Sequence, residues 1–435
     1  MKHLRYSGND FNREVQVLYK ISHKKIRQLM HTGGLLLLLL APTACSCGER
    51  GRLSSEPVTI SFDYPDDEAV YYEELIAEFN EIYPQVTIVN VDDRGDDELS
   101  PDVFFTSPFE LSDQLEEKAI LSLDPLIQQD ESFIPSDYYP GTVEQFTWED
   151  KLWAAPAGVS VMVLYYNKDL FDQYGVPYPR PGWTWDDFLD AAQAMRDPVY
   201  DIYGYGDIDQ YFDPLIFVYL HGGSITDSMQ NPTRMTYDEP QTIEAMEWYA
   251  ALLHDYNVAP QRTQLYEIGG NAMAGVYGNR VGMWIDWIDQ RGGSSNSSDD
   301  WPALWKMRWG MAPLPRAEQA IVPMVTVGYA ISSNTAHPEA CWEWIAFMQD
   351  QTRVPFDMIP ARKSLAESDE YRELAGSDVV DTAQASLKDA LPLSPALFEF
   401  INFDIYGRAI NSILTGNSTP AEALSRAQQQ SEGGD

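Results

Sequence analysis

The histidines of this chain are too scattered to suggest a catalytic or metal centre. Beyond the first 44 residues they are His221, His254 and His337, far apart in sequence, and each is expected to be an ordinary surface or capping residue. The chain has no G-x-S-x-G nucleophile motif, no Walker phosphate loop and no H-E-x-x-H metalloprotease motif. We therefore expect no cofactor and no metal, and an enzyme is the less favoured interpretation.

Pairs of carboxylates are the remaining route to catalysis, for example Asp207 with Asp209 or Asp286 with Asp289. Among 67 Asp and Glu residues such pairs arise by chance, and a glycosidase needs two carboxyl groups at a defined separation that sequence does not reveal. The acidic segment 92–98, DDRGDDE, lacks the spaced ligands and distant Glu of a calcium loop. Acids beside aromatic rings, as at Trp284, Asp286 and Trp287, are better suited to binding.

The charge of the chain limits its partners. The formal net charge is −38, and residues 1–44 contribute +5, so the remainder carries −43. Polyanions are repelled by such a surface and no basic stripe is visible, which excludes nucleic acid as the natural partner. We expect the acids to keep a secreted protein soluble and monomeric.

The first 44 residues have the pattern of a lipoprotein signal peptide. A basic region ends at Arg27, and the apolar run Leu35–Ala41 is shorter than the roughly 20 residues that span a bilayer. Small residues precede Cys45, the preferred lipidation site, with Cys47 as the alternative, and residues 45–56 form a tether. The body of the chain contains Cys341 alone, without a disulfide partner there, on the expected buried face of a helix.

Hydrophobic periodicity predicts the elements that must position any site. A strand over 58–62, a helix over 71–82 and a strand over 86–91 form a β-α-β start, which favours a parallel sheet. A buried strand over 159–166 is followed by a helix from Thr184, whose hydroxyl can cap it together with Asp187. An amphipathic helix is expected at 242–253, and 292–300 has linker composition. The elements at 279–287, 325–331, 337–348 and 419–427 are expected from the family resemblance described next.

The segment LYYNKDLFDQYGVP at 164–177, followed by TWDDFLDAA at 184–192, resembles the signature region of the extracellular solute-binding proteins of ABC importers, family 1, especially the oligosaccharide (maltose-binding-like) branch. The segment PDVFF at 101–105 resembles the PDV strand of that family. Other motifs match in order, so the resemblance covers roughly residues 57–430. It implies a type II periplasmic-binding-protein-like α/β fold with two discontinuous lobes, a hinge and a ligand cleft. The lobes are expected at 56–158 with 328–363 and at 159–327 with 364–430.

The same resemblance implies an extracytoplasmic, membrane-anchored protein that captures a carbohydrate and delivers it to the membrane subunits of an ABC importer. Sugars offer apolar C–H patches to aromatic rings and hydroxyls to planar polar side chains. Of the two tryptophans in the strand before residue 288, Trp284 is favoured because it shares a face with Asp286. The substrate-binding residues implied are Tyr64, Ser107, Phe109, Gln210, Tyr211, Trp284, Asp286, Trp287, Gly328, Tyr329 and Arg362.

Two alternatives remain open at this stage. A sugar-sensing protein that presents its ligand to a receptor kinase would have the same sequence pattern. A secreted glycosidase is less favoured. For Arg362, a salt bridge between the lobes is an alternative to ligand contact, and core packing is the alternative for each tryptophan.

Overall fold

The computed structural model describes residues 55–64, 68–91, 101–206, 212–261, 264, 276, 278–291, 305–317, 320–388 and 390–433. Several sequence predictions lie outside these ranges and are untested by them. They are the signal peptide, the lipidated cysteine at Cys45 or Cys47, the acidic segment 92–98, the site residues Gln210 and Tyr211, and the linker at 292–300.

The first lobe begins with the predicted β-α-β unit. Strands β1 (Val58–Phe62) and β2 (Val86–Asn90) pair in parallel around helix α2 (Ala69–Ile82), whose apolar side chains at helical spacing face the core. Strand β3 (Val103–Thr106) pairs with the other edge of β1, also in parallel. Helix α12 (Pro338–Met348) packs on the same layer and carries the buried Cys341. The predicted parallel sheet is therefore confirmed.

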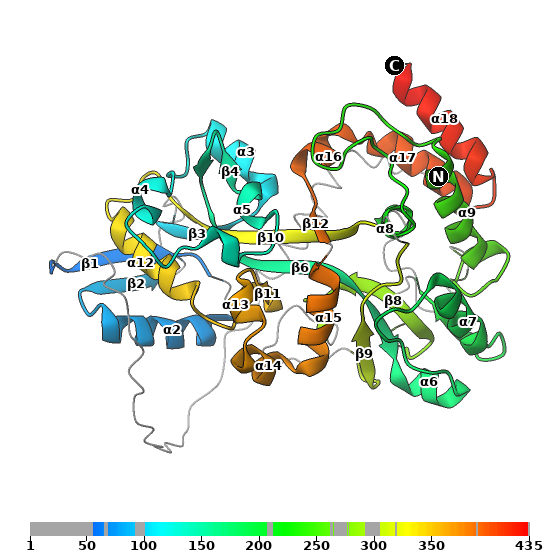
Figure 1. The fold of residues 1–435 in the computed structure, drawn as a ribbon, viewed down its shortest axis with the longest axis horizontal. Helices are drawn as coiled ribbons and strands as arrows, with labels where there is room; N and C mark the ends of the chain where they lie inside the picture. The colour runs from blue at the N-terminus through cyan, green and yellow to red at the C-terminus, as the bar shows by residue number, and fades with distance from the viewer. Residues whose placement is uncertain are drawn as a thin grey trace, which may run out of the picture.

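Two long strands run through the middle of the molecule and enter both lobes (Figure 1). Strand β6 (Ala155–Asn167) is buried along its whole length. Its first half pairs antiparallel with β10 (Val322–Ile331), and its second half pairs with strands of the second lobe. The far end of β10 pairs with β3. The backbone ladder is thus continuous from lobe to lobe, in the order β2-β1-β3-β10-β6-β8-β7.

The second lobe is built on the second half of β6. Strands β8 (Val281–Trp287) and β9 (Trp309–Ala312) pair antiparallel with it, and β7 (Tyr203–Tyr205) pairs in parallel with β8. Helix α7 (Trp185–Met195) is capped by Thr184, as predicted. The Asp187 amide donates to the Thr184 hydroxyl oxygen, and the Asp187 carboxylate accepts from the Thr184 amide.

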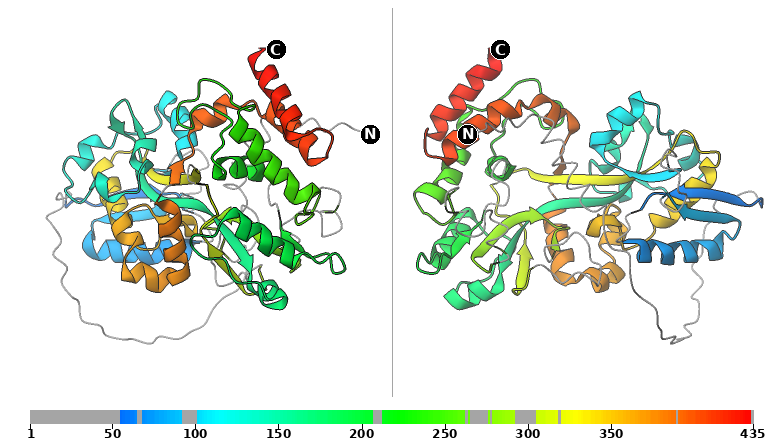
Figure 2. Two further views of the ribbon diagram at one scale, coloured as in Figure 1. Left: turned by 45° about the vertical axis from the view of Figure 1, so that its right-hand side comes forward. Right: turned by 180° about the vertical axis from the view of Figure 1, so that it is seen from behind.

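The remaining elements surround this frame (Figure 2). The second lobe also holds α6 (Lys168–Tyr174), α8 (Phe212–Leu220), α9 (Pro240–His254), α17 (Phe403–Leu414) and α18 (Pro420–Glu432). The first lobe is extended by four helices and a hairpin. The helices are α3 (Pro108–Glu116), α4 (Asp124–Ile127), η3 (Pro135–Asp137) and α5 (Thr142–Gln145), and the hairpin consists of β4 (Thr147–Trp148) and β5 (Lys151–Leu152). Near the crossing strands lie η5 (Pro355–Asp357), β11 (Ile359–Pro360), α13 (Lys363–Ala366), α14 (Asp369–Ala375), α15 (Ser377–Leu387), β12 (Ala390–Pro392) and α16 (Pro395–Phe400).

The buried apolar residues form two clusters. One cluster holds most buried residues from Ile60 to Ala157 and from Val327 to Met358. The other holds Tyr138 and Tyr139 and most buried residues from Val159 to Met324 and from Ile359 to Ala427. The fold therefore has two cores, each assembled from segments distant in sequence. The exact lobe boundaries stay a prediction, and Ile359 packs in the second core although its segment was assigned to the first lobe.

Within the ranges that the structure describes, none of the helices combines the length and the apolar composition needed to cross a bilayer.

Candidate ligand-binding site

Two helices from different lobes meet above the crossing strands in Figure 1. Phe109, in the first turn of α3, contacts Phe398 of α16 edge to face, with ring centroids 5.2 Å apart. Phe398 in turn stacks on Phe403 at the start of α17, at 6.2 Å and 24°. All three rings are only partly buried. Aromatic side chains of both lobes thus gather at one place.

The local structure of α3 fixes the direction of Phe109. Ser107 precedes the helix and Pro108 opens it, where proline lacks only an amide that would be unbonded anyway. The carboxylate of Glu110 accepts hydrogen bonds from the Ser107 amide at 3.0 Å and from its hydroxyl at 3.1 Å. The Ser107 hydroxyl therefore serves the helix start in this conformation.

Strand β8 carries Asp286 and Trp287, both partly exposed, at its carboxyl end. The Asp286 carboxylate accepts from the Trp287 amide at 2.8 Å. Burial raises the pKa of Asp286 to about 8, and the nearby Asp289 acts in the same direction. Asp289 accepts a hydrogen bond from the Ser160 hydroxyl of β6. At pH 7 a carboxyl group in this setting can hold its proton, so it can donate as well as accept.

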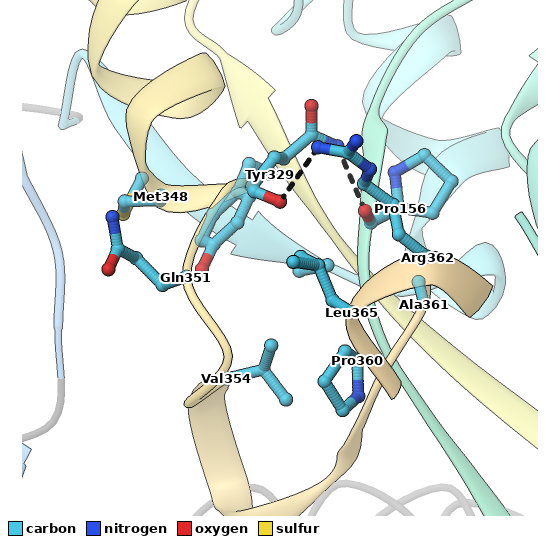
Figure 3. Close-up of a pocket in the computed structure, with 11 residues that line it drawn as sticks. Pro156, Tyr329, Met348, Gln351, Val354, Pro360, Ala361, Arg362 and Leu365 are labelled. Carbon is cyan, nitrogen blue, oxygen red and sulfur yellow. Dashed lines mark hydrogen bonds between the residues drawn. The ribbon is translucent and has the colours of Figure 1, made fainter. Parts of the chain in front are cut away.

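A small pocket lies at the hinge, and Figure 3 shows Tyr329, Arg362 and Leu365 around it. Its volume of about 10 Å³ is roughly one water molecule, far too little for a sugar. Arg362 pairs with Asp137 at 3.0 Å and with Asp350 at 2.6 Å. Gln349 donates to the Pro156 carbonyl at 2.9 Å. These contacts join the segments at the hinge and leave no open ligand site there.

A sequence profile described as "Bacterial extracellular solute-binding protein" matches residues 65–352. The chain belongs to this family. The family's location is outside the cytoplasm, and its members and the solved neighbours are substrate-binding proteins.

The relatives agree with this assignment. A putative binding protein of Brucella abortus is 24% identical over 294 residues, which are 65% of this chain and 68% of the relative. The ABC substrate-binding protein Lmo0181 from Listeria monocytogenes, solved with cycloalternan, superposes with a TM-score of 0.66 at 20% identity, covering 87% of this chain and 99% of that chain. Maltose-bound MalE3 of T. maritima gives 0.64 at 19% identity, covering 86% and 99%. The two-lobed α/β fold expected from the resemblance is thereby confirmed.

For this solute-binding protein, Trp284 is the aromatic site residue that the sequence favours, but its ring is part of the core in this structure. Its side chain is 0% exposed. The ring stacks on Tyr165 at 5.8 Å and meets Trp305 edge to face at 4.9 Å. Strand alternation correctly separated Trp284 from Trp287, but the Trp284 face is the one covered by the segment around Trp305, with Tyr165 of the neighbouring strand beside it. Trp287 is the more accessible of the two.

Three further predicted site residues are engaged in other contacts in this structure. Tyr64 is 8% exposed and packs on Phe62 and Tyr72 in the first core. Tyr329 is 3% exposed and packs on Phe105 at 5.2 Å. Arg362 is held by Asp137 and Asp350, which fall in the same expected lobe, so this is a salt bridge within that lobe and not the expected one between the lobes. In this conformation none of the three offers a free face to a ligand.

Gly328 lies where β10 shifts register against β6. A Cβ there would lie 3.0 Å from the Phe146 ring and 3.1 Å from the Ala155 carbonyl oxygen. The glycine therefore allows close packing of β10 on its neighbours, and ligand contact by its backbone stays a prediction.

The structure adds Phe398 and Phe403, which sequence reasoning missed. Both occur in the segment LFEFINF at 397–403, which looks like the apolar side of an ordinary helix. The available signal was Pro395 and Asn402, which divide the segment into the start of α16 and the cap of α17 and so place both rings near helix ends.

Proposed function

We propose that the protein captures a neutral oligosaccharide or related polyol between its lobes, outside the membrane, and delivers it to an ABC importer. The observation that carries the proposal is the meeting of Phe109 with Phe398 and Phe403 across the two lobes. Rings contributed by both lobes suit the apolar faces of a sugar.

The solved neighbours support a saccharide ligand. Their bound molecules include cycloalternan, maltose, acarbose and mannotriose. UgpB from Mycobacterium tuberculosis was solved with glycerophosphocholine, so the fold also holds a phosphodiester. For this chain the net charge of −38 disfavours a ligand with excess negative charge. A sugar-sensing protein of a receptor kinase would use the same site, and a glycosidase would release reducing sugar from its substrate.

The proposed site comprises Phe109, Phe398 and Phe403, with Trp287 as a further candidate. Among the sequence-predicted residues, Ser107, Gln210, Tyr211 and Gly328 remain candidates.

A thermal-shift screen across a carbohydrate panel tests the class of ligand, because a ligand at 100 times its Kd stabilises by about 2.7 kcal/mol. With the best sugar, Phe398→Ala should weaken binding about tenfold in calorimetric titration. Phe400→Ala is the matched control, since Phe400 lies on the same helix but is 37% exposed. Equal affinities of the two variants would remove Phe398 from the site.

We also propose that lipid on Cys45 holds the protein at the membrane as a monomer. The support is the short apolar run and the small residues before Cys45. Cys45→Ser should move the protein from the membrane fraction to the soluble fraction. If Cys47→Ser alone releases it, the modified residue is Cys47, and retention of both variants would contradict a lipid anchor.

A further inference from the structure

The linker between β12 and α16, residues 392–394, leads to the aromatic site. It connects β12, which pairs in parallel with β10, to the helix that carries Phe398. In Figure 1, α3, α5 and α16 all lie above the crossing strands, so the linker leads to the side on which the lobes touch. Contacts that hold this linker therefore also influence where Phe398 lies against Phe109.

The second lobe holds the linker through Gln230. The side-chain amide of Gln230 donates to the Pro392 carbonyl oxygen at 2.8 Å, and the Ser394 hydroxyl donates to the Gln230 carbonyl oxygen at 3.0 Å. Leu393, between these two residues, is 3% exposed and packs in the second core. The linker is thus fastened to the second lobe and should move with it.

Gln145 approaches the same linker from helix α5, which lies at the boundary between the two cores. Tyr139, before this helix, packs in the second core, whereas Phe146, directly after Gln145, is fully buried in the first. The Nε2 of Gln145 donates to the Leu393 carbonyl oxygen at 2.7 Å. Since a carbonyl oxygen can only accept, this bond fixes the orientation of the Gln145 amide.

The oxygen of the same amide is bound to a crossing strand. The Oε1 of Gln145 accepts a hydrogen bond from the Thr326 hydroxyl of β10 at 2.6 Å, and Thr326 is 4% exposed. Thr326 lies where β10 passes from one core to the other, because Met324 packs in the second core and Val327 in the first. One side chain at the first-lobe end of α5 therefore joins this point of β10 to the linker of the second lobe.

Opening of the lobes on this side would separate Gln145 from Leu393. The linker is fastened to the second lobe, so bending of β6 and β10 would move it away from the end of α5, together with Phe398. The released amide and carbonyl would then bind water. One such exchange changes an equilibrium by about fivefold, which is small enough to be reversible.

We propose that Gln145 is a latch that holds the lobes closed by joining the end of α5 to the 392–394 linker. It is a positioning residue, because it keeps Phe398 against Phe109 and sets the fraction of ligand-free molecules that are closed. Its importance for ligand capture rests on the proposed function, but the latch itself operates in the protein without ligand.

The test measures the distance between the lobes in the ligand-free full chain. Cysteines introduced by Asp113→Cys on α3 and Arg408→Cys on α17 carry nitroxide labels, and both positions are exposed. Cys45 and Cys47 are changed to serine, and Cys341 is buried and should stay unlabelled. Double electron–electron resonance then gives the populations of short and long distances.

Two variants remove the latch in different ways. Gln145→Met keeps the length of the side chain and loses both hydrogen bonds, whereas Gln145→Glu keeps the acceptor for Thr326 and loses the donor to Leu393. In both variants the ratio of closed to open molecules should fall by at least about fivefold. Sugar affinity in calorimetric titration should fall by the same factor as the closed fraction.

Gln230→Ala is the matched control. It removes an amide donor to the neighbouring Pro392 carbonyl, but that bond lies within the second lobe, so the distances should stay unchanged. Unchanged distances in both Gln145 variants would overturn the proposal, and so would an equal shift in Gln230→Ala. The distances are measured without ligand, so the latch can fail while sugar binding is confirmed, and it can hold when no sugar binds.

Discussion

At the residue scale, we expect replacement of the two tryptophans of β8 to have opposite effects on stability and on sugar binding. Trp284→Ala should lower the free energy of unfolding by about 3–5 kcal/mol, because a fully buried ring is removed from between Tyr165 and Trp305. Trp287→Ala should cost less stability and weaken sugar binding at least tenfold, about 1.4 kcal/mol. Urea unfolding and calorimetric titration of both variants separate stability from affinity. A Trp284→Ala protein with unchanged stability would contradict the core assignment.

His221 gives a prediction about pH. It was expected at the surface or at a cap, but its ring stacks on Trp185 at 4.2 Å, and burial lowers its pKa to about 4. The unfolded chain, with a histidine pKa near 6.5, binds the proton first as the pH falls. The protein should therefore lose stability between about pH 6.5 and 4, by at most about 3 kcal/mol from this group.

His221→Phe keeps the aromatic stack and removes the titration, so urea unfolding at pH 7 and pH 4.5 should show a smaller difference for this variant than for the wild type. His254→Phe provides the comparison, because His254 lies in the same lobe, where its Nε2 lies 3.0 Å from the Ile413 carbonyl oxygen. An identical pH dependence for wild type and His221→Phe would exclude His221 as its source.

At the element scale, the capped start of α7 can be tested directly. Thr184→Ala removes the hydroxyl that accepts from the Asp187 amide at 3.1 Å, and should cost about 1 kcal/mol of stability. Gln193→Ala, on the exposed side of the same helix, should leave stability nearly unchanged. Chemical unfolding measures both. A loss in Gln193→Ala equal to that in Thr184→Ala would show that the cap itself adds nothing.

The elements with a clear apolar pattern were predictable from sequence, including α2, α7, α9 and α12. Helices α2 and α7 bury one side, α9 packs against α8 and α18, and α12 is buried nearly all round. The site was less predictable. Alternation along β8 shows that Trp284 and Trp287 lie on opposite faces, but both faces of this strand carry apolar residues, so it does not show which is covered. The contact of Phe109 with Phe398 joins residues nearly 300 positions apart, and no local pattern encodes it.

At the scale of the whole molecule, strands β6 and β10 pair with each other and run from one lobe into the other. Closure at the hinge would therefore bend this pair of strands. Saturating sugar should select the closed arrangement and reduce the radius of gyration measured by small-angle scattering. Phe398→Ala, measured at sugar concentrations that saturate the wild type, should compact less. An unchanged radius in the wild type with bound sugar would contradict hinge closure.

The buried thiol of Cys341 can report how often the first core opens. Its thiol is buried in the first core, and burial raises its pKa to about 12, so it should react with thiol reagents only when that core opens. In a chain with Cys45 and Cys47 changed to serine, the labelling rate of Cys341 would therefore measure how often the first lobe opens. Comparing that rate with and without sugar would reveal whether a ligand held between the lobes slows the opening of one lobe on its own.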